Sequence, residues 1–248
     1  MIDVDAAVRQ AVRAFWRTRA AQSRRQGGES GRRDRGGRRA VTAGHHADGF
    51  AALAAEIVRD AGLDAASIRW DGKRARTLPG YFRTSKEWDL LVIHGEELVA
   101  AIEVKSHVGS FGNNFNNRVE EALGSALDCA TAWKHGRFAP SPRPWLGYML
   151  MVEAHPESTA PTRPMQLQPF PADPAFQGLS YLDRYRQLGL RLLREGLYDA
   201  VCLIASAADA GRTGAYQEPD PELGVRAFAT LLHARAGAFA RIGPSPAR

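Results

Sequence analysis

A β-hairpin is predicted by residues 89–105, which read DLLVIHGEELVAAIEVK. Its two apolar runs, residues 89–93 and 98–105, flank the polar tetrapeptide His94-Gly95-Glu96-Glu97. Runs of this length on either side of a short polar turn are typical of two antiparallel strands. The apolar composition further predicts that both strands are buried on both faces.

Charged side chains gather at one end of this hairpin. Residues two apart on a strand point to the same face, so Glu103 and Lys105 project together while Val104 points into the core. Folding the chain about its turn brings Asp89 opposite Ile102 or Glu103. A buried strand rarely ends in carboxylates that have no partner, and a divalent cation is a natural partner for them.

These groups suit a metal-dependent phosphodiesterase. Asp89, Glu103 and the backbone carbonyl of Val104 offer hard oxygen ligands of the kind that Mg²⁺ prefers. Lys105 would orient or polarise a metal-bound water, or stabilise charge on the phosphorus. The pattern alone also allows a surface ion pair between Glu103 and Lys105, and another acidic-x-Lys triplet occurs at Asp71-Gly72-Lys73, in a turn.

The elements on either side of the hairpin predict one α/β domain over residues 1–248, with a mixed central sheet flanked by helices. Helices are expected at residues 3–21, 47–61, 118–135, 176–195 and 223–241, and further strands at 145–152 and 200–205. The catalytic core is expected to span residues 47–248. Nine of the fourteen prolines lie in residues 140–174, so most of 154–174 is predicted to be an irregular loop.

The excess of positive charge lies at the N-terminus. Residues 1–40 contain eleven arginines and four acids, a net charge of +7, whereas the rest of the chain carries −1. Residues 22–39 contain no apolar side chain, so residues 22–40 are expected to form a basic flexible arm or loop. The candidates for contact with DNA phosphates in this arm are Arg24, Arg25, Arg32, Arg33, Arg35, Arg38 and Arg39. The alternative is a solvated tract, since arginine is abundant throughout the chain.

Two features argue against a membrane or secreted protein. No stretch approaches the roughly 20 consecutive apolar residues of a membrane helix, and the N-terminus is acidic where a secretory signal would be basic and then apolar. The only cysteines, Cys129 and Cys202, are too few for a disulfide framework or a thiolate zinc site. A cytoplasmic protein without a membrane segment is therefore expected.

Longer motifs resemble one known family. They are LPGYFRTSKEWDLLVI at residues 78–93, AAIEVKS at 100–106, SFGNNFNNR at 110–118 followed by Glu120 and Glu121, and the N-terminal pieces AVRAFW at 11–16, RAVTAG at 39–44 and DGF at 48–50. Through them the chain resembles the XhoI family of type II restriction endonucleases over about residues 1–150, and its length also suits that family.

The resemblance implies a PD-(D/E)XK nuclease fold, Mg²⁺ dependence, a homodimer, and cleavage of double-stranded DNA at the palindrome CTCGAG with 5′ overhangs. By position, Asp89 matches the first acid of the motif, Glu103 the second and Lys105 the lysine. Trp88 stands where the motif's name has proline, a change that leaves the ligand chemistry untouched. Glu56, on the predicted helix 47–61, resembles the additional acid that some of these nucleases bring to the metal; a solvated helix glutamate is the alternative.

The polar segment after the hairpin is expected to face DNA. Residues 109–117 are predicted to form a Gly- and Asn-rich loop, whose amides can bond base edges or phosphates. The candidate DNA-binding residues outside the arm are Asn113, Asn114, Asn116, Asn117, Arg118, Lys86 and Arg83. The alternatives are that the asparagines only form turns and cap the next helix, and that Lys86 and Arg83 are ordinary surface residues.

The sequence thus predicts a dimeric, Mg²⁺-dependent restriction endonuclease in which each subunit cleaves one strand of a palindromic site. A companion DNA methyltransferase would protect the same site in the host. Two alternatives remain open. One is a structure-selective repair or recombination nuclease with the same catalytic hairpin, and the other is a non-catalytic DNA-binding protein in which the acidic hairpin is structural.

Overall fold

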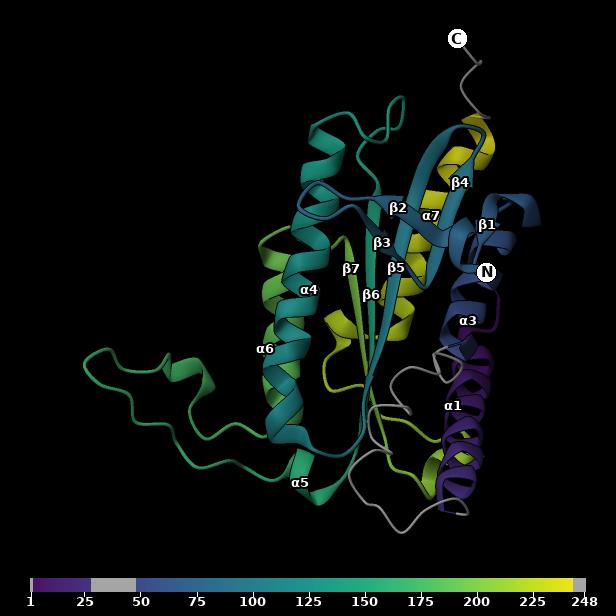
Figure 1. Cartoon of the computed structure of the whole chain (residues 1–248). Coiled ribbons are helices and arrows are strands. Elements are labelled where there is room, and N and C mark those ends of the chain that lie inside the picture. Colours follow the sequence, from purple (N-terminus) through teal and green to yellow (C-terminus); the bar gives the residue numbers. More distant parts are fainter. Residues whose placement is uncertain (1, 28–47, 243–248) are drawn as a thin grey trace.

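A five-stranded mixed β-sheet forms the centre of the structure, a computed structural model that describes residues 2–27 and 48–242, except for the side chains of residues 23–27 and 113 (Figure 1). In spatial order the strands are β1 (Ile68–Arg69), β4 (Leu90–His94), β5 (Glu97–His107), β6 (Trp145–Glu153) and β7 (Ala200–Ser206). Pairing is antiparallel from β1 to β5 and parallel from β5 to β7. The predicted hairpin, both later strands and the mixed sheet are confirmed.

Helices cover both faces of the sheet and enclose a separate apolar core on each side (Figure 1). One face packs against α1 (Val4–Gly27), α3 (Asp48–Asp60) and α7 (Val225–Ile242), and the other packs against α4 (Phe111–Lys134) and α6 (Tyr181–Arg194). Because side chains alternate along a strand, β5 sends Ile102 and Val104 into the first core and Ala101 into the second.

Strands β6 and β7 are apolar on both faces because each lies between two helix layers. Every residue of β7 is buried, and so is every residue of β6 except the last. Gly147 of β6 allows α7 to approach closely, since a Cβ at this position would lie 2.9 Å from Cζ of Phe228. The ring of Phe228 packs edge-on against Trp145 at 5.4 Å between ring centroids.

Several short elements escaped prediction. Strands β2 (Thr77–Pro79) and β3 (Ser85–Glu87) form a separate antiparallel pair, and α5 (Pro156–Thr159) interrupts the predicted proline-rich loop. Short 3-10 turns lie at Ala65–Ser67, Lys73–Arg76, Pro174–Phe176, Ala210–Thr213 and Pro221–Leu223. Strands of two or three residues are too short to produce a recognisable alternation of apolar and polar side chains.

The first helix is longer than predicted. It continues from Ala21 to Gly27, where the described part of this segment ends, so the first residues of the expected arm are helical. Arginine and glutamine are good helix formers, which explains how residues without an apolar face extend a helix that is already packed. The remainder of the predicted arm, residues 28–40, lies outside the part of the chain that the structure describes.

The predicted Asn-rich loop is wrong at its C-terminal side, because α4 begins at Phe111 rather than Arg118. The turn is confined to Gly109 and Ser110, both with positive φ. Phe111 and Phe115 are one helical turn apart and both pack inward, Phe111 against His107 and Phe115 against Tyr185. This aromatic pair extends the buried face of α4 toward its N-terminus.

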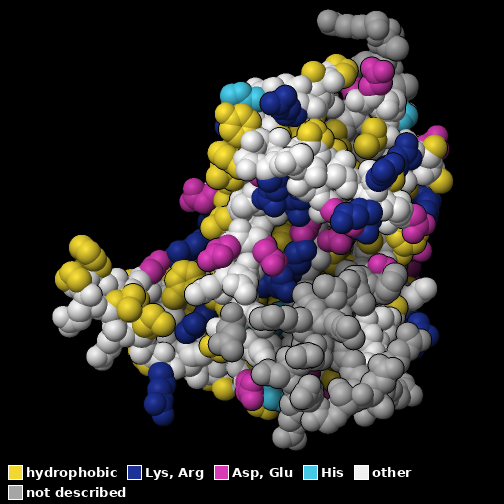
Figure 2. All heavy atoms as spheres, in the orientation of Figure 1, with side chains coloured by type: hydrophobic (Ala, Val, Ile, Leu, Met, Phe, Trp, Pro, Cys, Tyr) yellow, Lys and Arg dark blue, Asp and Glu magenta, His cyan; other side chains and the backbone are white. Residues whose placement is uncertain are grey.

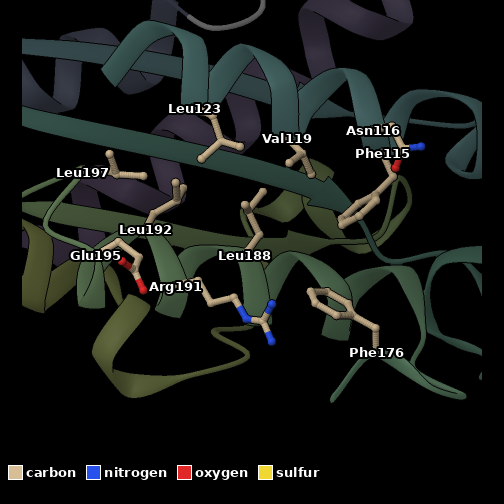
Figure 3. A pocket seen from close by; sticks show the side chains of 10 residues that line it. All are labelled: Phe115, Asn116, Val119, Leu123, Phe176, Leu188, Arg191, Leu192, Glu195 and Leu197. Carbon is tan, nitrogen blue, oxygen red and sulfur yellow. The ribbon is translucent and has the colours of Figure 1, made fainter. Parts of the chain in front are cut away.

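The proline-rich segment is irregular from Ala160 to Asp173, as predicted, and projects from the body of the molecule (Figure 1). Helix α6 begins at Tyr181 rather than near residue 176, because the hydroxyl of Ser180 caps it by accepting a hydrogen bond from the Asp183 amide at 3.1 Å. Beside the base of this segment, α4 and α6 line an apolar cavity of about 380 Å³ (Figure 3). Every helix in residues 2–27 and 48–242 is too short or too polar to cross a membrane.

Candidate active site

The end of the β4–β5 hairpin brings two acids together. The strand register pairs Leu90 with Ile102, and the Asp89 amide donates to the Ile102 carbonyl at 3.2 Å, so Asp89 lies across from Glu103. The side chain of Asp89 is held in place by the amide of Val104, which donates to Oδ2 at 2.7 Å. The predicted position of Asp89 relative to the second strand is confirmed.

Glu103 is clamped between two lysines. Lys105 forms an ion pair with its Oε1, and Nζ of Lys86 lies 2.9 Å from its Oε2. The Glu103 side chain is only 5% exposed. Burial by itself would raise the pKa of Glu103, but the charges and hydrogen bonds of Lys105 and Lys86 outweigh it and lower the pKa. Glu103 is therefore a carboxylate at neutral pH.

Asp89 and Lys105 respond to the same neighbours in opposite ways. Burial, and then repulsion from the Glu103 carboxylate, raise the pKa of Asp89 to about 6. Burial would lower the pKa of Lys105, but the charges of Glu103 and Asp89 outweigh it and raise the pKa. Lys105 thus stays an ammonium ion, suited to donating hydrogen bonds and stabilising negative charge rather than to accepting a proton.

The arrangement of Asp89 and Glu103 suits a divalent cation. Two facing carboxylates that repel each other are relieved by a cation between them, and carboxylate oxygens are hard ligands of the kind Mg²⁺ prefers. Within residues 2–27 and 48–242, no third His, Cys, Asp or Glu joins them. The Val104 carbonyl, waters and substrate phosphate would therefore complete the ligand set.

Further polar side chains from α4, β5 and α6 lie near these residues. On α4, Arg118 forms an ion pair with Glu121, whose charge acts on Lys105. Further along β5, Nδ1 of His107 lies 2.5 Å from the hydroxyl of Tyr185. No signal in the sequence placed Glu121 or Tyr185 near the site. For His107 there was a signal, because its i, i+2, i+4 spacing with Glu103 and Lys105 on one strand predicts that the three side chains share a face.

Two of the predicted site residues lie elsewhere. Glu56 is exposed and lines the groove between α1 and α3. Arg83 forms a 3.0 Å ion pair with buried Asp128 and donates to the Gly124 carbonyl, so it anchors the turn between β2 and β3 to α4. The structure thus favours the solvated-glutamate alternative for Glu56.

The predicted DNA-binding asparagines lie in the first turns of α4. Asn116 and Asn117 are exposed, and Nδ2 of Asn114 donates to the Ser110 carbonyl at 3.4 Å. Arg118 is largely turned inward, with its side chain 18% exposed. The side chains of Asn113, Arg24 and Arg25, and the whole of Arg32, Arg33, Arg35, Arg38 and Arg39, fall outside the description. Charged side chains of both signs gather across the middle of the face shown in Figure 2.

Comparison with known proteins decides the family. The model of the family "Restriction endonuclease XhoI" matches residues 26–218. This chain belongs to the XhoI restriction endonuclease family. It is 41% identical to type II restriction enzyme BstVI of Geobacillus stearothermophilus over 202 residues, which make up 79% of this chain and 89% of the relative. Two further relatives extend this similarity.

Type II restriction enzyme XhoI of Xanthomonas vasicola is 42% identical over 202 residues, 79% of this chain and 78% of that protein. Type II restriction enzyme AbrI of Azospirillum brasilense is 51% identical over 160 residues, 64% of this chain and 70% of that protein. No solved structure matches the chain significantly. As a member of the XhoI family, the chain is a type II restriction endonuclease, a class of site-specific deoxyribonucleases that generally need a divalent metal ion.

Proposed function

We propose that this protein is a Mg²⁺-dependent endonuclease that cuts both strands of DNA at the palindrome CTCGAG and leaves 5′ overhangs. The observation that carries the chemistry is the facing pair Asp89 and Glu103 beside the ammonium group of Lys105. The sequence specificity is supported by the resemblance of the motifs to the XhoI family and by the 42% identity to a relative that bears that name.

In this proposal each side chain has one task. Asp89, Glu103 and the Val104 carbonyl would hold Mg²⁺, which when bound supplies a polarised water and a positive charge beside the scissile phosphate. Lys105 positions the attacking water and stabilises the negative charge that builds on the phosphoryl oxygens. The bond from phosphorus to the 3′ oxygen breaks, which leaves 5′-phosphate and 3′-hydroxyl ends.

A palindromic site is read most simply by two copies of one chain whose two-fold axis coincides with that of the DNA. We therefore propose a homodimer, with DNA contacts from Asn113, Asn114, Asn116 and Asn117 at the start of α4, from Arg118 beside them, and from the arginines of residues 24–39. A companion methyltransferase would share the recognition site without binding the nuclease.

The test is digestion of a plasmid of known sequence with and without Mg²⁺, followed by run-off sequencing of the ends. Discrete Mg²⁺-dependent fragments that end within CTCGAG are expected, and a plasmid with a single base changed in that site is the control. Random nicks, or cuts confined to branched or damaged DNA, would instead indicate a repair nuclease. DNA that is bound but left intact in every divalent metal would indicate a non-catalytic DNA-binding protein.

The contribution of the arginine-rich segment is measured separately. Each arginine that neutralises a phosphate releases condensed counterions, so replacing Arg32, Arg33 and Arg35 with glutamine should weaken DNA binding and flatten its dependence on salt concentration. The slope of log affinity against log salt should fall by roughly 0.9 for each lost phosphate contact. An unchanged slope would show that the segment does not touch DNA.

A further inference from the structure

Lys86 occupies an unusual position for a surface-strand lysine. It lies on the three-residue strand β3, yet its side chain is only 12% exposed. Its ammonium group has three partners: Oε2 of Glu103 at 2.9 Å, the Glu87 carbonyl at 3.3 Å and the ring of Trp88 at 4.7 Å from the centroid. Lys73, on the adjacent turn, is 80% exposed and lies 3.6 Å from Glu87. The burial of Lys86 is therefore specific to its contact with the active site.

The two lysines occupy one site on each oxygen of Glu103. Lys105 pairs with Oε1 and Lys86 pairs with Oε2. A cation that binds Glu103 therefore competes with two ammonium groups for the same carboxylate and is repelled by their charge. Lys105 lies on the same strand, two residues away on the same face, so its tether keeps it beside Glu103. Lys86 comes from a different sheet. When Glu103 binds a cation, the Glu87 carbonyl and the Trp88 ring can still stabilise the Lys86 ammonium group.

The charges of the site give the displaced lysine a new partner. Two carboxylates, Asp89 and Glu103, and two ammonium groups, Lys86 and Lys105, balance one another in the metal-free protein. A divalent cation adds two positive charges, and the scissile phosphate brings a negative one. An ammonium group released from Glu103 in this buried setting is drawn to the phosphate oxygens.

We propose that Lys86 is a second active-site lysine, which shields Glu103 while the metal and DNA are absent and then contacts the scissile phosphate. This inference rests on the proposed function and adds a residue outside the Asp89, Glu103 and Lys105 set. It assigns Lys86 to the chemistry of cleavage rather than to the binding of DNA at large. In the free protein Lys86 hinders metal binding at Glu103, and in the protein that holds metal and DNA it stabilises negative charge on the scissile phosphate.

The test compares Lys86→Met with Lys86→Arg and with the matched control Lys73→Met. Calorimetric titration of the DNA-free proteins with Ca²⁺ measures the shielding. Lys86→Met should bind Ca²⁺ at least about fivefold more tightly than wild type, because the ion no longer competes with the charge and hydrogen bond of Lys86 at Oε2 of Glu103. Lys73→Met should match wild type. Unchanged or weaker Ca²⁺ binding by Lys86→Met would overturn the shielding role.

Single-turnover cleavage at saturating Mg²⁺ measures the contact with phosphate. Lys86→Met should cut roughly 100-fold more slowly than wild type, since a buried donor to the transition state is lost. Lys86→Arg should recover most of the rate, and Lys73→Met should cut normally. A Lys86→Met rate within threefold of wild type would overturn the catalytic role. If Lys86→Met does not fold, Lys86→Gln, which removes the charge but keeps a polar side chain, takes its place in both measurements, with the same directions and smaller effects expected.

Failure of the proposed function can be told apart from failure of the inference about Lys86. A wild-type protein that cuts no DNA in any divalent metal defeats the proposed function, and the Ca²⁺ titrations still decide whether Lys86 shields Glu103. A wild-type protein that cuts at CTCGAG, together with a Lys86→Met variant that matches it in both measurements, defeats only the inference about Lys86.

Discussion

The two faces of the central sheet are covered by similar amphipathic helices, yet they differ in what β5 places beneath them. Toward α1, α3 and α7 the strand presents Ile102 and Val104, which pack in a core of aliphatic and aromatic side chains. Toward α4 and α6 it presents Glu103, Lys105 and His107. One strand thus presents apolar side chains on one face and charged or polar ones on the other, because successive side chains alternate.

The faces also differ in how well their buried polar atoms are paired. On the apolar face, the indole N–H of Trp16 donates to the Ser206 hydroxyl at 3.0 Å. On the other face, the hydroxyl of Tyr148 and Nε of Arg118 are buried and have no hydrogen-bond partner within the described part of the chain. Unpaired buried polar atoms lower stability, so this face is organised for function rather than for the greatest stability.

The largest effect should follow from removing one of the two facing carboxylates, Asp89 or Glu103. Asp89→Asn and Glu103→Gln should each lower the single-turnover rate of DNA cleavage by roughly 1000-fold or more, because each loses a ligand on which the transition state depends. Affinity for a CTCGAG duplex in the presence of a chelator should change little. Cleavage retained by both variants would contradict the assignment of the site.

The next effect belongs to the apolar face. Phe228→Ala should lower the free energy of unfolding by about 3–5 kcal/mol, since it leaves a cavity beside Gly147 and Trp145 where no polar group compensates. Urea denaturation followed by tryptophan fluorescence measures this loss. A loss below about 1 kcal/mol would mean that α7 does not carry the core of this face.

Stability should depend on pH through Asp89. Its folded-state pKa of about 6 lies above the ordinary value of 3.8, so its contribution to stability is fully present below pH 4 and is lost as pH rises through 6. Asparagine does not ionise, so Asp89→Asn does not lose this stability as the pH rises. In a chelator it should therefore be more stable than wild type at pH 7.5 by roughly 2 kcal/mol, and much less so at pH 4.5.

Thermal denaturation at the two pH values measures this difference. Addition of Ca²⁺ should stabilise the wild type more than the variant, because the variant keeps Glu103 but lacks the ionised Asp89. An equal stability difference between variant and wild type at both pH values would show that Asp89 does not titrate near 6.

The smallest effect is expected at Tyr148. Its hydroxyl is buried and has no partner among residues 2–27 and 48–242, so Tyr148→Phe should change the free energy of unfolding by less than about 1 kcal/mol, with an increase as the favoured direction. The same urea titration serves as the measurement, with Phe228→Ala as its counterpart on the other face. A loss above about 1.5 kcal/mol would reveal a hydrogen bond that this hydroxyl makes in solution.

The catalytic hairpin could be predicted from sequence because its information is local. Alternation along β5 assigns Glu103 and Lys105 to one face, and the position of the turn sets Asp89 across from Glu103. The beginning of α4 could not be placed in the same way. Four asparagines and a glycine suggested a loop, and only the packing of Phe111 and Phe115 against residues of other elements makes that segment helical.

The amino-acid sequence by itself determined the mixed α/β architecture and the family, and it predicted the three central residues of the proposed site, because each depends on periodicity or on a contiguous motif. The tertiary structure decided which long side chains reach the site. It turned Lys86 of the small β2–β3 sheet onto Glu103, Arg83 onto Asp128, and Glu56 toward α1. A flexible side chain takes the partner that packing between distant elements leaves within its reach, and no local pattern encodes that choice.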